Sequence, residues 1–298
     1  MPKIEYVSKK FKDEKLELIA KVNDIVDEYE RQGYSLTLRQ VYYQLVARDV
    51  IPNNERSYKN LGVLISDARL AGVIDWDSIV DRTRFLRQRA HWDDPEDILR
   101  SAAHSFSVDK WEDANSYCEV WVEKDALIDV VEQVCVTYDV NCLSCRGYVS
   151  QSTMWESARR LIDVDKDITI FHLEDHDPSG KDMSRDIEDR LKLFGANISF
   201  ERIALNFDQI EYYRPPPNPT KLTDSRSTGY VDEFGYECWE LDALEPRVIT
   251  DLISNKIKPV MDEDLFELHQ KREDLEKERL KRFASTYSDF AESEEFAN

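Results

Sequence analysis

Between residues 116 and 205, short apolar runs alternate with longer segments that have helical periodicity. The apolar runs are SYCEVWV (116–122), VNCLSC (140–145), DITIFHL (167–173) and NISFERIAL (197–205). The segments between them, 124–138, 151–163 and 181–194, have the apolar spacing of amphipathic helices. Because parallel strands need crossover connections, this alternation predicts an α/β domain with a mostly parallel sheet flanked by helices.

The N-terminal part has a different pattern, with three helices predicted at 11–31, 38–49 and 55–71. Thr37 is a suitable N-cap for the second helix, and Gly72 is placed to end the third. Two short apolar pieces follow in GVIDWDSIVDRTRF (72–85) and are consistent with a hairpin. Helix, turn, helix and hairpin in this order predict a winged helix-turn-helix domain, which binds DNA in many proteins.

The predicted organisation is a winged helix-turn-helix domain at 1–100, an α/β domain at 101–260, and a charged C-terminal helix and tail at 261–298. HWDDPED (91–97) is interpreted as the linker between the first two. No run of eighteen apolar residues is present, so we expect no membrane span. The N-terminus lacks the apolar segment of a signal peptide, and the five cysteines are an odd number, so we expect a cytoplasmic protein without structural disulfides.

The net charge of −21 disfavours nucleic acid as a partner, because DNA is itself a polyanion. The charge is unevenly distributed, however. Residues 1–90 hold 16 of the 40 basic residues but only 14 of the 61 acidic ones. A solvated charged face would explain such a set, but the local basic excess favours a DNA-facing surface. The basic residues in question are Arg56, Lys59, Arg69, Arg82, Arg84, Arg87 and Arg89.

Acidic residues follow two of the predicted strands. Glu123 comes directly after 116–122, and Glu174, Asp175 and Asp177 follow 167–173. Ligands of open parallel sheets bind where the strands end, so these side chains are expected at one edge. Strand alternation directs Asp175 and Asp177 to one side and His176 to the other. Carboxylates of this kind suit Mg²⁺, with Mn²⁺ as a substitute.

VEKDA (122–126) and DHDPSG (175–180) resemble the two signatures of the Toprim domain, which occurs in topoisomerases, primases and some nucleases. The resemblance implies that Glu123, Asp175 and Asp177 bind Mg²⁺ for phosphodiester chemistry, with Glu174 outside the ligand set. A winged helix-turn-helix before a Toprim domain resembles the topoisomerase VI A subunit and the transesterase that makes meiotic double-strand breaks, in the compact Mini-A form. This resemblance covers roughly residues 30 to 260.

That family carries an Arg-x-x-Tyr-Tyr-like stretch, which here reads Arg39-Gln40-Val41-Tyr42-Tyr43. The resemblance implies that Tyr43 is the catalytic tyrosine and that Arg39 assists it. In a helix, Tyr42 lies on the apolar face, whereas Tyr43 lies about 100° further round, one turn from Arg39. We therefore expect Tyr42 to be structural and Tyr43 to be available. The alternative is that Tyr43 only packs against the wing or stacks on DNA.

The resemblance implies Mg²⁺-dependent DNA cleavage of the type IIB topoisomerase A-subunit kind, leaving a 5′-phosphotyrosyl link. It also implies a homodimer on double-stranded DNA, with tyrosine and metal from different subunits, and a separate ATPase subunit for strand passage. Two alternatives stay open: a Toprim nuclease that uses water, and a DNA-binding component without catalysis. Glu240-Leu241-Asp242 is similar to an acidic patch of the family but receives no role, and Lys221 and Arg226 are surface charges or phosphate contacts.

Overall fold

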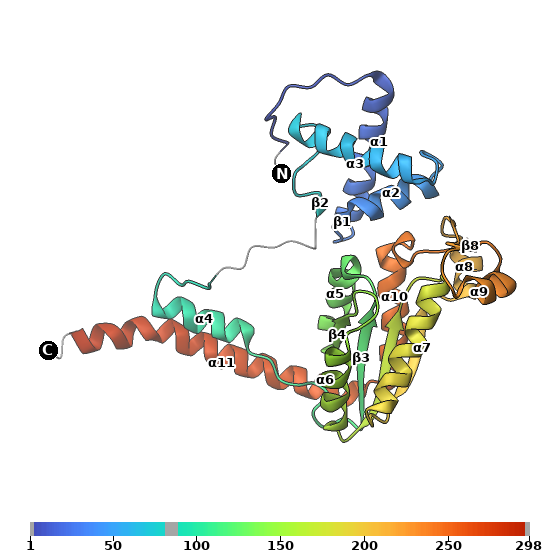
Figure 1. The fold of residues 1–298 in the computed structure, drawn as a ribbon. Helices are drawn as coiled ribbons and strands as arrows, with labels where there is room; N and C mark the ends of the chain where they lie inside the picture. Colours follow the sequence, from blue (N-terminus) through green and yellow to red (C-terminus); the bar gives the residue numbers. More distant parts are fainter. Residues whose placement is uncertain (1–2, 81–88, 296–298) are drawn as a thin grey trace.

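The computed structural model of the chain describes residues 3–80 and 89–295, with side chains up to Tyr287. Its N-terminal helices form one unit, the parallel sheet and its helices form a second, and two long helices project from the sheet unit as an arm (Figure 1). Within the described ranges, no helix combines the length and the hydrophobicity that crossing a bilayer requires.

The N-terminal unit consists of α1 (Asp13–Glu30), α2 (Leu38–Ala47) and α3 (Glu55–Leu70), and these confirm the three predicted helices. Thr37 begins α2 with a capping box: its hydroxyl accepts from the Gln40 backbone N–H at 3.3 Å, and the Gln40 side chain accepts from the Thr37 N–H at 2.8 Å. The apolar faces of all three helices meet in one core, which includes Val22, Tyr42 and Leu61.

The predicted wing is not confirmed. Residues 73–78 form bends and irregular chain, and β2 (Ile79–Val80) pairs in parallel with β1 (Leu36–Thr37). The second half of the expected hairpin, and with it Arg82, Arg84 and Arg87, lies outside the described residues. The described part is therefore a three-helix unit closed by a two-residue parallel pair, and the winged helix stays a prediction.

The central sheet has the strand order β4-β3-β5-β6, and all of its pairings are parallel. The strands are β3 (Ser116–Val122), β4 (Asn141–Ser144), β5 (Asp167–Leu173) and β6 (Ser199–Ala204), which confirms the predicted α/β class. Val122 at the end of β3 is in register with Leu173 at the end of β5. Because these two strands are neighbours, the acidic residues that follow them emerge side by side.

Helices cover both faces of the sheet. On one face, α5 (Ile128–Tyr138) and α10 (Pro246–Ile257) pack on Val120 and Val122; on the other, α6 (Gln151–Ile162) and α7 (Pro178–Leu193) pack on Trp121. The alternation along β3 thus divides the core into two layers. Further elements that the sequence analysis did not predict are α8 (Phe207–Tyr213), α9 (Ser227–Phe234), α10, β7 (Asn218–Pro219) and β8 (Glu237–Cys238). All five cysteines are free thiols.

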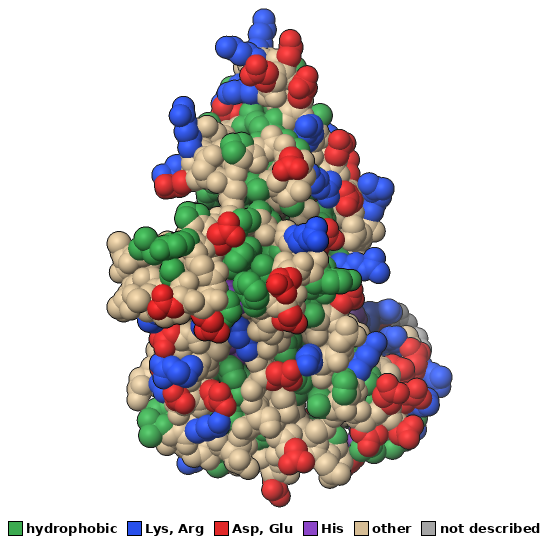
Figure 2. Space-filling model, turned by 90° about the vertical axis from the view of Figure 1, so that its right-hand side faces the viewer, with side chains coloured by type: hydrophobic (Ala, Val, Ile, Leu, Met, Phe, Trp, Pro, Cys, Tyr) green, Lys and Arg blue, Asp and Glu red, His purple; other side chains and the backbone are tan. Residues whose placement is uncertain are grey.

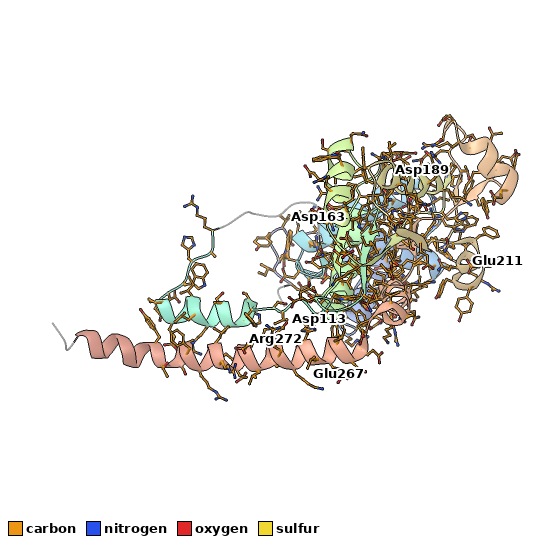
Figure 3. All side chains as sticks on the ribbon, turned by 90° about the horizontal axis from the view of Figure 1, so that it is seen from below. Asp113, Asp163, Asp189, Glu211, Glu267 and Arg272 are labelled. Atoms are coloured by element: carbon orange, nitrogen blue, oxygen red, sulfur yellow. The ribbon has the colours of Figure 1, made fainter. Side chains whose placement is uncertain are left out.

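The arm consists of α4 (Pro95–Ser105) packed along α11 (Glu263–Glu295), and it extends away from the sheet (Figures 1 and 3). The interpretation of 91–97 as a linker is wrong in its last part, because Asp94 caps α4 and Pro95 is its first residue. At the base of the arm, Lys110 Nζ donates to Glu273 Oε2 at 2.7 Å. The predicted charged C-terminal helix is confirmed. It packs along α4, which the sequence analysis divided between the first two domains.

Candidate functional site

The acidic residues predicted from the sequence meet at the carboxyl edge of the sheet. The Glu123 N–H donates to the Leu173 carbonyl at 3.0 Å, which extends the pairing of β3 and β5 beyond their last residues. Asp175 lies two residues beyond the end of β5, and Asp177 is the N-cap of α7. Two further acids join them from the chain near the 3₁₀ turn Leu241–Ala243: Glu240 and Asp242. The Glu-x-Asp spacing is present in the sequence, but these residues follow no strand of the central sheet, so no local pattern predicted that they lie at this edge.

Lys124 lies among these carboxylates. Its ammonium is 3.0 Å from Asp175 Oδ1, 2.9 Å from Glu240 Oε2 and 2.8 Å from Asp242 Oδ1. Burial opposes its charge, but the three carboxylates raise the pKa of Lys124 well above its usual range. Burial raises the pKa of Asp175 to about 7, although Lys124 and the Leu241 N–H, which donates to Asp175 Oδ1 at 2.7 Å, act in the opposite direction. The lysine thus neutralises part of the acidic cluster from within.

Asp177 has a structural role in this conformation. Its Oδ1 accepts from the Gly180 N–H at 2.6 Å, so it is the N-cap of α7, which starts at Pro178 rather than at 181 as predicted. Position 180 also requires a glycine, because a Cβ there would lie 2.2 Å from the Asp175 carbonyl oxygen. The turn that presents both aspartates therefore depends on a glycine in close contact with their backbone.

The three predicted ligands lie at one edge but do not converge on one point. Among the described residues, no three His, Cys, Asp or Glu side chains are arranged to hold a metal ion. Asp175 is engaged by Lys124, and Asp177 by the start of α7, whereas Glu123 Oε2 is buried without a hydrogen-bond partner. The donor chemistry fits Mg²⁺, because all are hard oxygen ligands. The assignment of Glu123, Asp175 and Asp177 as a ligand set stays a prediction.

Tyr43 is buried, contrary to the expectation from its helix face. Only 4% of it is exposed, and its hydroxyl accepts from Asn218 Nδ2 at 3.0 Å. Burial raises the pKa of Tyr43 above its usual range, and Glu240 adds to the shift. Tyr42 is equally buried and donates to Asn53 Oδ1 at 2.8 Å. The face of α2 that a lone helix would leave open is covered by the chain around Asn218.

Arg39 links the helical unit to the acidic edge. Its guanidinium donates to Glu240 Oε2 at 2.6 Å, and its Nε lies 3.9 Å from Asp242 Oδ2. The guanidinium carbon is also 5.7 Å from the centre of the Tyr58 ring. The predicted cation, Arg39, is present, but in this conformation its guanidinium is paired with Glu240 and Asp242.

Tyr43, Asp175 and Asp177 line one cavity of about 700 Å³, which we call the Tyr43 cavity. Lys124 and Lys221 also contribute to its wall. The tyrosine and the aspartates that the resemblance assigns to different subunits thus share a cavity within one chain. A phosphate group that entered this cavity would meet the Tyr43 side chain, three basic residues and five acidic ones. These are Arg39, Lys124 and Lys221, and Glu55, Asp175, Asp177, Asp224 and Glu240.

Glu174 does not line this cavity. It is fully buried behind Asp175, where Ser184 donates to its Oε2 at 3.1 Å. Burial raises the pKa of Glu174 to about 9, although Arg202 opposes the shift. Arg202 also donates to the Asp175 backbone oxygen at 2.6 Å. Glu174, Ser184 and Arg202 thus stabilise the end of β5 on the side away from the cavity. The sequence analysis had placed Glu174 outside the ligand set.

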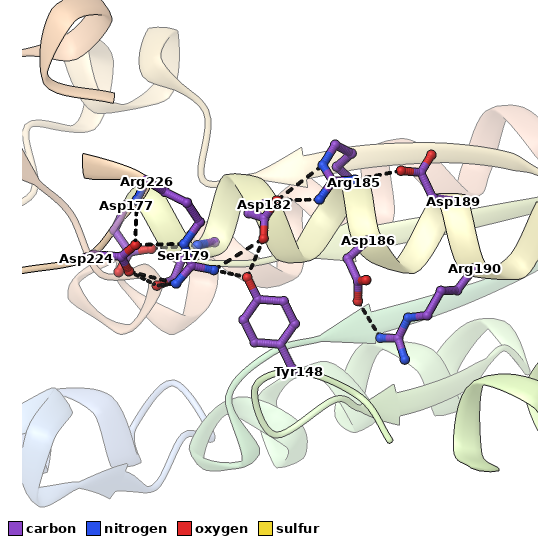
Figure 4. A network of polar contacts seen from close by, with 11 residues as sticks. Tyr148, Asp177, Ser179, Asp182, Arg185, Asp186, Asp189, Arg190, Asp224 and Arg226 are labelled. Atoms are coloured by element: carbon purple, nitrogen blue, oxygen red, sulfur yellow. Dashed lines mark hydrogen bonds and ion pairs between the residues drawn. The ribbon is translucent and has the colours of Figure 1, made fainter. Parts of the chain in front are cut away.

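Arg226, interpreted as a surface charge or phosphate contact, is bound within the protein. Its guanidinium donates to Asp224 Oδ2 at 2.7 Å, to Ser179 Oγ at 3.2 Å and to Asp182 Oδ2 at 3.2 Å, and it also contacts Tyr148 (Figure 4). These bonds fasten the loop that contains Asp224 to the first turns of α7. The loop forms part of the wall of the Tyr43 cavity.

The predicted DNA-facing surface stays a prediction. Arg69 donates to the Trp76 backbone oxygen at 3.0 Å and lies over the Trp76 ring, so it stabilises the helical unit from within. Lys59 is exposed but pairs with Glu55 at 2.6 Å. Acidic and basic side chains alternate over the face shown in Figure 2 without a broad patch of one sign. The described residues on that face therefore form a surface of mixed charge.

Comparison of the chain with protein-family models and with curated proteins gives no match. The resemblance to Toprim and topoisomerase VI A-like proteins therefore rests on the two acidic motifs, the tyrosine motif and their order along the chain.

Proposed function

We propose that this protein cleaves DNA by Mg²⁺-dependent transesterification, with Tyr43 as the nucleophile. One observation carries the proposal: the Tyr43 hydroxyl and the Asp175 and Asp177 carboxylates line the same cavity of about 700 Å³. A tyrosine beside paired carboxylates at the carboxyl edge of a parallel sheet matches the chemistry that the sequence motifs imply.

In the proposed reaction, the Tyr43 oxygen attacks a backbone phosphorus and loses its proton. A phosphotyrosyl bond forms to the 5′ end, the bond to the 3′ oxygen breaks, and that oxygen takes up a proton and leaves as a hydroxyl. Glu123, Asp175 and Asp177 would hold Mg²⁺, which when bound neutralises charge on the scissile phosphate. Lys124 and Arg39 supply positive charge beside the same cavity.

The reaction requires the Tyr43 cavity to open, since Tyr43 is almost completely buried. The polar contacts that close it include Arg39 with Glu240, Asn53 with Asn218 and the Pro217 carbonyl, and Asn218 with the Tyr43 hydroxyl. These are polar contacts between the helical unit and the chain around β7 and β8, and a single small apolar residue, Ala243, packs beside them into the core of the helical unit. Such contacts separate at lower cost than a packed hydrophobic interface does.

The burial of Tyr43 favours one alternative, hydrolysis by water with a structural tyrosine. A DNA-binding role without cleavage is the third candidate. In each case double-stranded DNA is the proposed partner. Pairing of two copies would allow both strands to be cut, and strand passage would need a separate ATPase subunit.

A covalent trapping experiment tests the proposal. The protein is incubated with end-labelled linear and supercoiled DNA and Mg²⁺ or Mn²⁺, then denatured. We expect label to remain on the wild type and on Tyr42→Phe, and to be lost with Tyr43→Phe. Tyr42→Phe is a matched control, because the neighbouring tyrosine is equally buried. Cleavage by Tyr43→Phe at the wild-type rate would establish the hydrolytic alternative instead.

A further inference from the structure

Three carboxylate oxygens surround the ammonium of Lys124 at the acidic edge of the sheet. Its nitrogen lies 3.0 Å from Asp175 Oδ1, 2.9 Å from Glu240 Oε2 and 2.8 Å from Asp242 Oδ1. We call these three acids the Lys124 site. Asp175 follows β5, whereas the other two lie near the 3₁₀ turn Leu241–Ala243. The fold therefore places three carboxylates around one point, and a positive charge occupies that point.

The Lys124 site holds more negative charge than its lysine neutralises. The Asp242 side chain is 1% exposed and that of Lys124 is 13% exposed, so bulk water screens neither charge well. Arg39 adds a second cation, because its guanidinium donates to Glu240 Oε2. Even so, Asp242 Oδ2 is buried and accepts no hydrogen bond from the part of the chain that the structure describes. A buried carboxylate oxygen without a partner is costly, so an ion of higher charge than an ammonium would stabilise the site.

The spacing of the three oxygens suits an ammonium and not Mg²⁺. Mg²⁺ binds oxygen ligands at about 2.0–2.1 Å, whereas these oxygens lie between 2.8 and 3.0 Å from the Lys124 nitrogen. The difference agrees with the finding that no three acids among the described residues are arranged for a metal ion. Mg²⁺ at the same point would require the ammonium to leave and each oxygen to move inward by about 1 Å. Lys124 and Mg²⁺ therefore exclude each other.

A second position for the ammonium lies in the Tyr43 cavity. Lys124 lines this cavity together with Tyr43 and Asp175. A lysine side chain has a flexible four-carbon stem, so its ammonium can turn toward a phosphate group while its backbone stays in place. A backbone phosphate beside Tyr43 would then replace the carboxylates as the partner of Lys124. The three acids of the Lys124 site would in turn be open to a divalent cation.

We propose that Asp175, Glu240 and Asp242 form a cation site that Lys124 occupies in this conformation, and that Mg²⁺ enters when a DNA phosphate binds the ammonium instead. The inference rests on the proposed function in naming DNA as the ligand that releases Lys124. It gives a role to the Glu240-Leu241-Asp242 segment, and Asp175 is common to this site and to the ligand set that the sequence motifs imply. Because each ligand removes an obstacle to the other, DNA and Mg²⁺ tighten each other's binding.

Mn²⁺ binding without DNA, measured on the full-length protein by calorimetry and electron paramagnetic resonance, tests the site itself. We expect Lys124→Met to bind Mn²⁺ about tenfold or more tightly than the wild type, because the competing ammonium is gone, and Lys124→Met/Asp242→Asn to lose this gain. Lys221→Met is the matched control, since Lys221 lines the Tyr43 cavity with an exposed side chain. Water and salt screen its charge, so it should change Mn²⁺ binding less than threefold. Wild-type affinity in folded Lys124→Met, or a gain that survives Asp242→Asn, would overturn the proposal.

The exchange with DNA is measured with Lys124 in place, so it does not depend on how well Lys124→Met folds. Tyr43→Phe protein is used, because it cannot form the phosphotyrosyl bond, and fluorescence anisotropy monitors binding of a short duplex. We expect the bound duplex to tighten Mn²⁺ binding about tenfold, but less than threefold once Lys124→Met is added. An unchanged Mn²⁺ affinity on the bound duplex would refute the exchange. A duplex that does not bind would refute the proposed function instead, and Mn²⁺ binding by Lys124→Met without DNA would still decide whether Lys124 excludes the ion.

Discussion

The ammonium of Lys124 lies 3.0 Å from the Asp175 carboxylate, the first aspartate of the DHDPSG motif. The same ammonium binds Glu240 and Asp242. One buried cation therefore balances three acids that come from two separate parts of the chain. In the free protein the acidic edge is an ion-paired cluster that links β3, the turn after β5 and the chain around Asp242.

Replacement of Lys124 by Met should destabilise the free protein strongly. It leaves three carboxylates without their shared cation, and loss of one partner from a buried ion pair costs about 3–5 kcal/mol. Urea denaturation in EDTA measures this loss. Lys256→Met is the control, because Lys256 pairs with Glu201 at the surface, where a pair contributes about 1 kcal/mol or less. Equal losses in the two variants would show that the cluster does not depend on Lys124.

Gly180→Ala should distort the turn that carries Asp175 and Asp177. The new Cβ would lie 2.2 Å from the Asp175 carbonyl oxygen, so the backbone has to move. We expect a loss of about 2–3 kcal/mol, in the range of overpacked sites. Gly229→Ala in α9 is the matched control, since a Cβ there meets nothing within 4 Å. Thermal denaturation should show a lower midpoint for Gly180→Ala and an unchanged or higher one for Gly229→Ala.

Glu273 should make the arm sensitive to acid. Burial would raise the pKa of Glu273, but hydrogen bonds from Lys110, Lys277 and the Val108 N–H lower it to about 2. A carboxyl group with a pKa lower in the folded state stabilises the fold above its unfolded pKa, near 4.5, and loses this contribution as the pH falls toward 2.

Urea denaturation at pH 6 and pH 3 measures that contribution. The difference in unfolding free energy between wild type and Glu273→Gln should be a few kcal/mol at most at pH 6, with about 1.4 kcal/mol for each pKa unit. It should shrink at pH 3. Glu267→Gln is the control, because Glu267 forms an exposed pair with Lys271 and should show almost no pH-dependent difference. A difference for Glu273→Gln that is the same at both pH values would contradict the role assigned to this carboxylate.

Asn218→Ala should expose Tyr43. It removes the hydrogen bond to the Tyr43 hydroxyl and the contact between Asn218 and Asn53, so the chain around β7 keeps fewer contacts with the helical unit. Hydroxyl-radical footprinting, read by mass spectrometry, should show at least twofold more oxidation of the peptide with Tyr43. Asn141→Ala is matched, because Asn141 also donates to a tyrosine hydroxyl, that of Tyr117, at 2.9 Å. Equal oxidation of the Tyr43 peptide in both variants would show that another contact keeps the tyrosine buried.

The sheet unit was predictable because its signals are local. Apolar runs such as 116–122 and 167–173 alternate with amphipathic segments, and parallel strands leave few ways to connect them. That topology also predicts that Glu123 and Asp175 lie at one edge of the sheet. The capping signal of α4, Asp94 followed by Pro95, was equally local, but it was interpreted as part of a linker.

The sequence by itself determined the three N-terminal helices, the helices between the sheet strands, the C-terminal helix, the parallel sheet and the acids at its carboxyl edge, because periodicity and caps depend on neighbouring residues. Only the tertiary structure decided which side chains the residues at that edge contact. The Tyr43 hydroxyl is bound by Asn218, which lies 175 positions away, and Asp242 binds Lys124 across 118 positions. A hydrogen bond or ion pair over such a separation exists only once the fold has brought its partners together, so no local pattern encodes it.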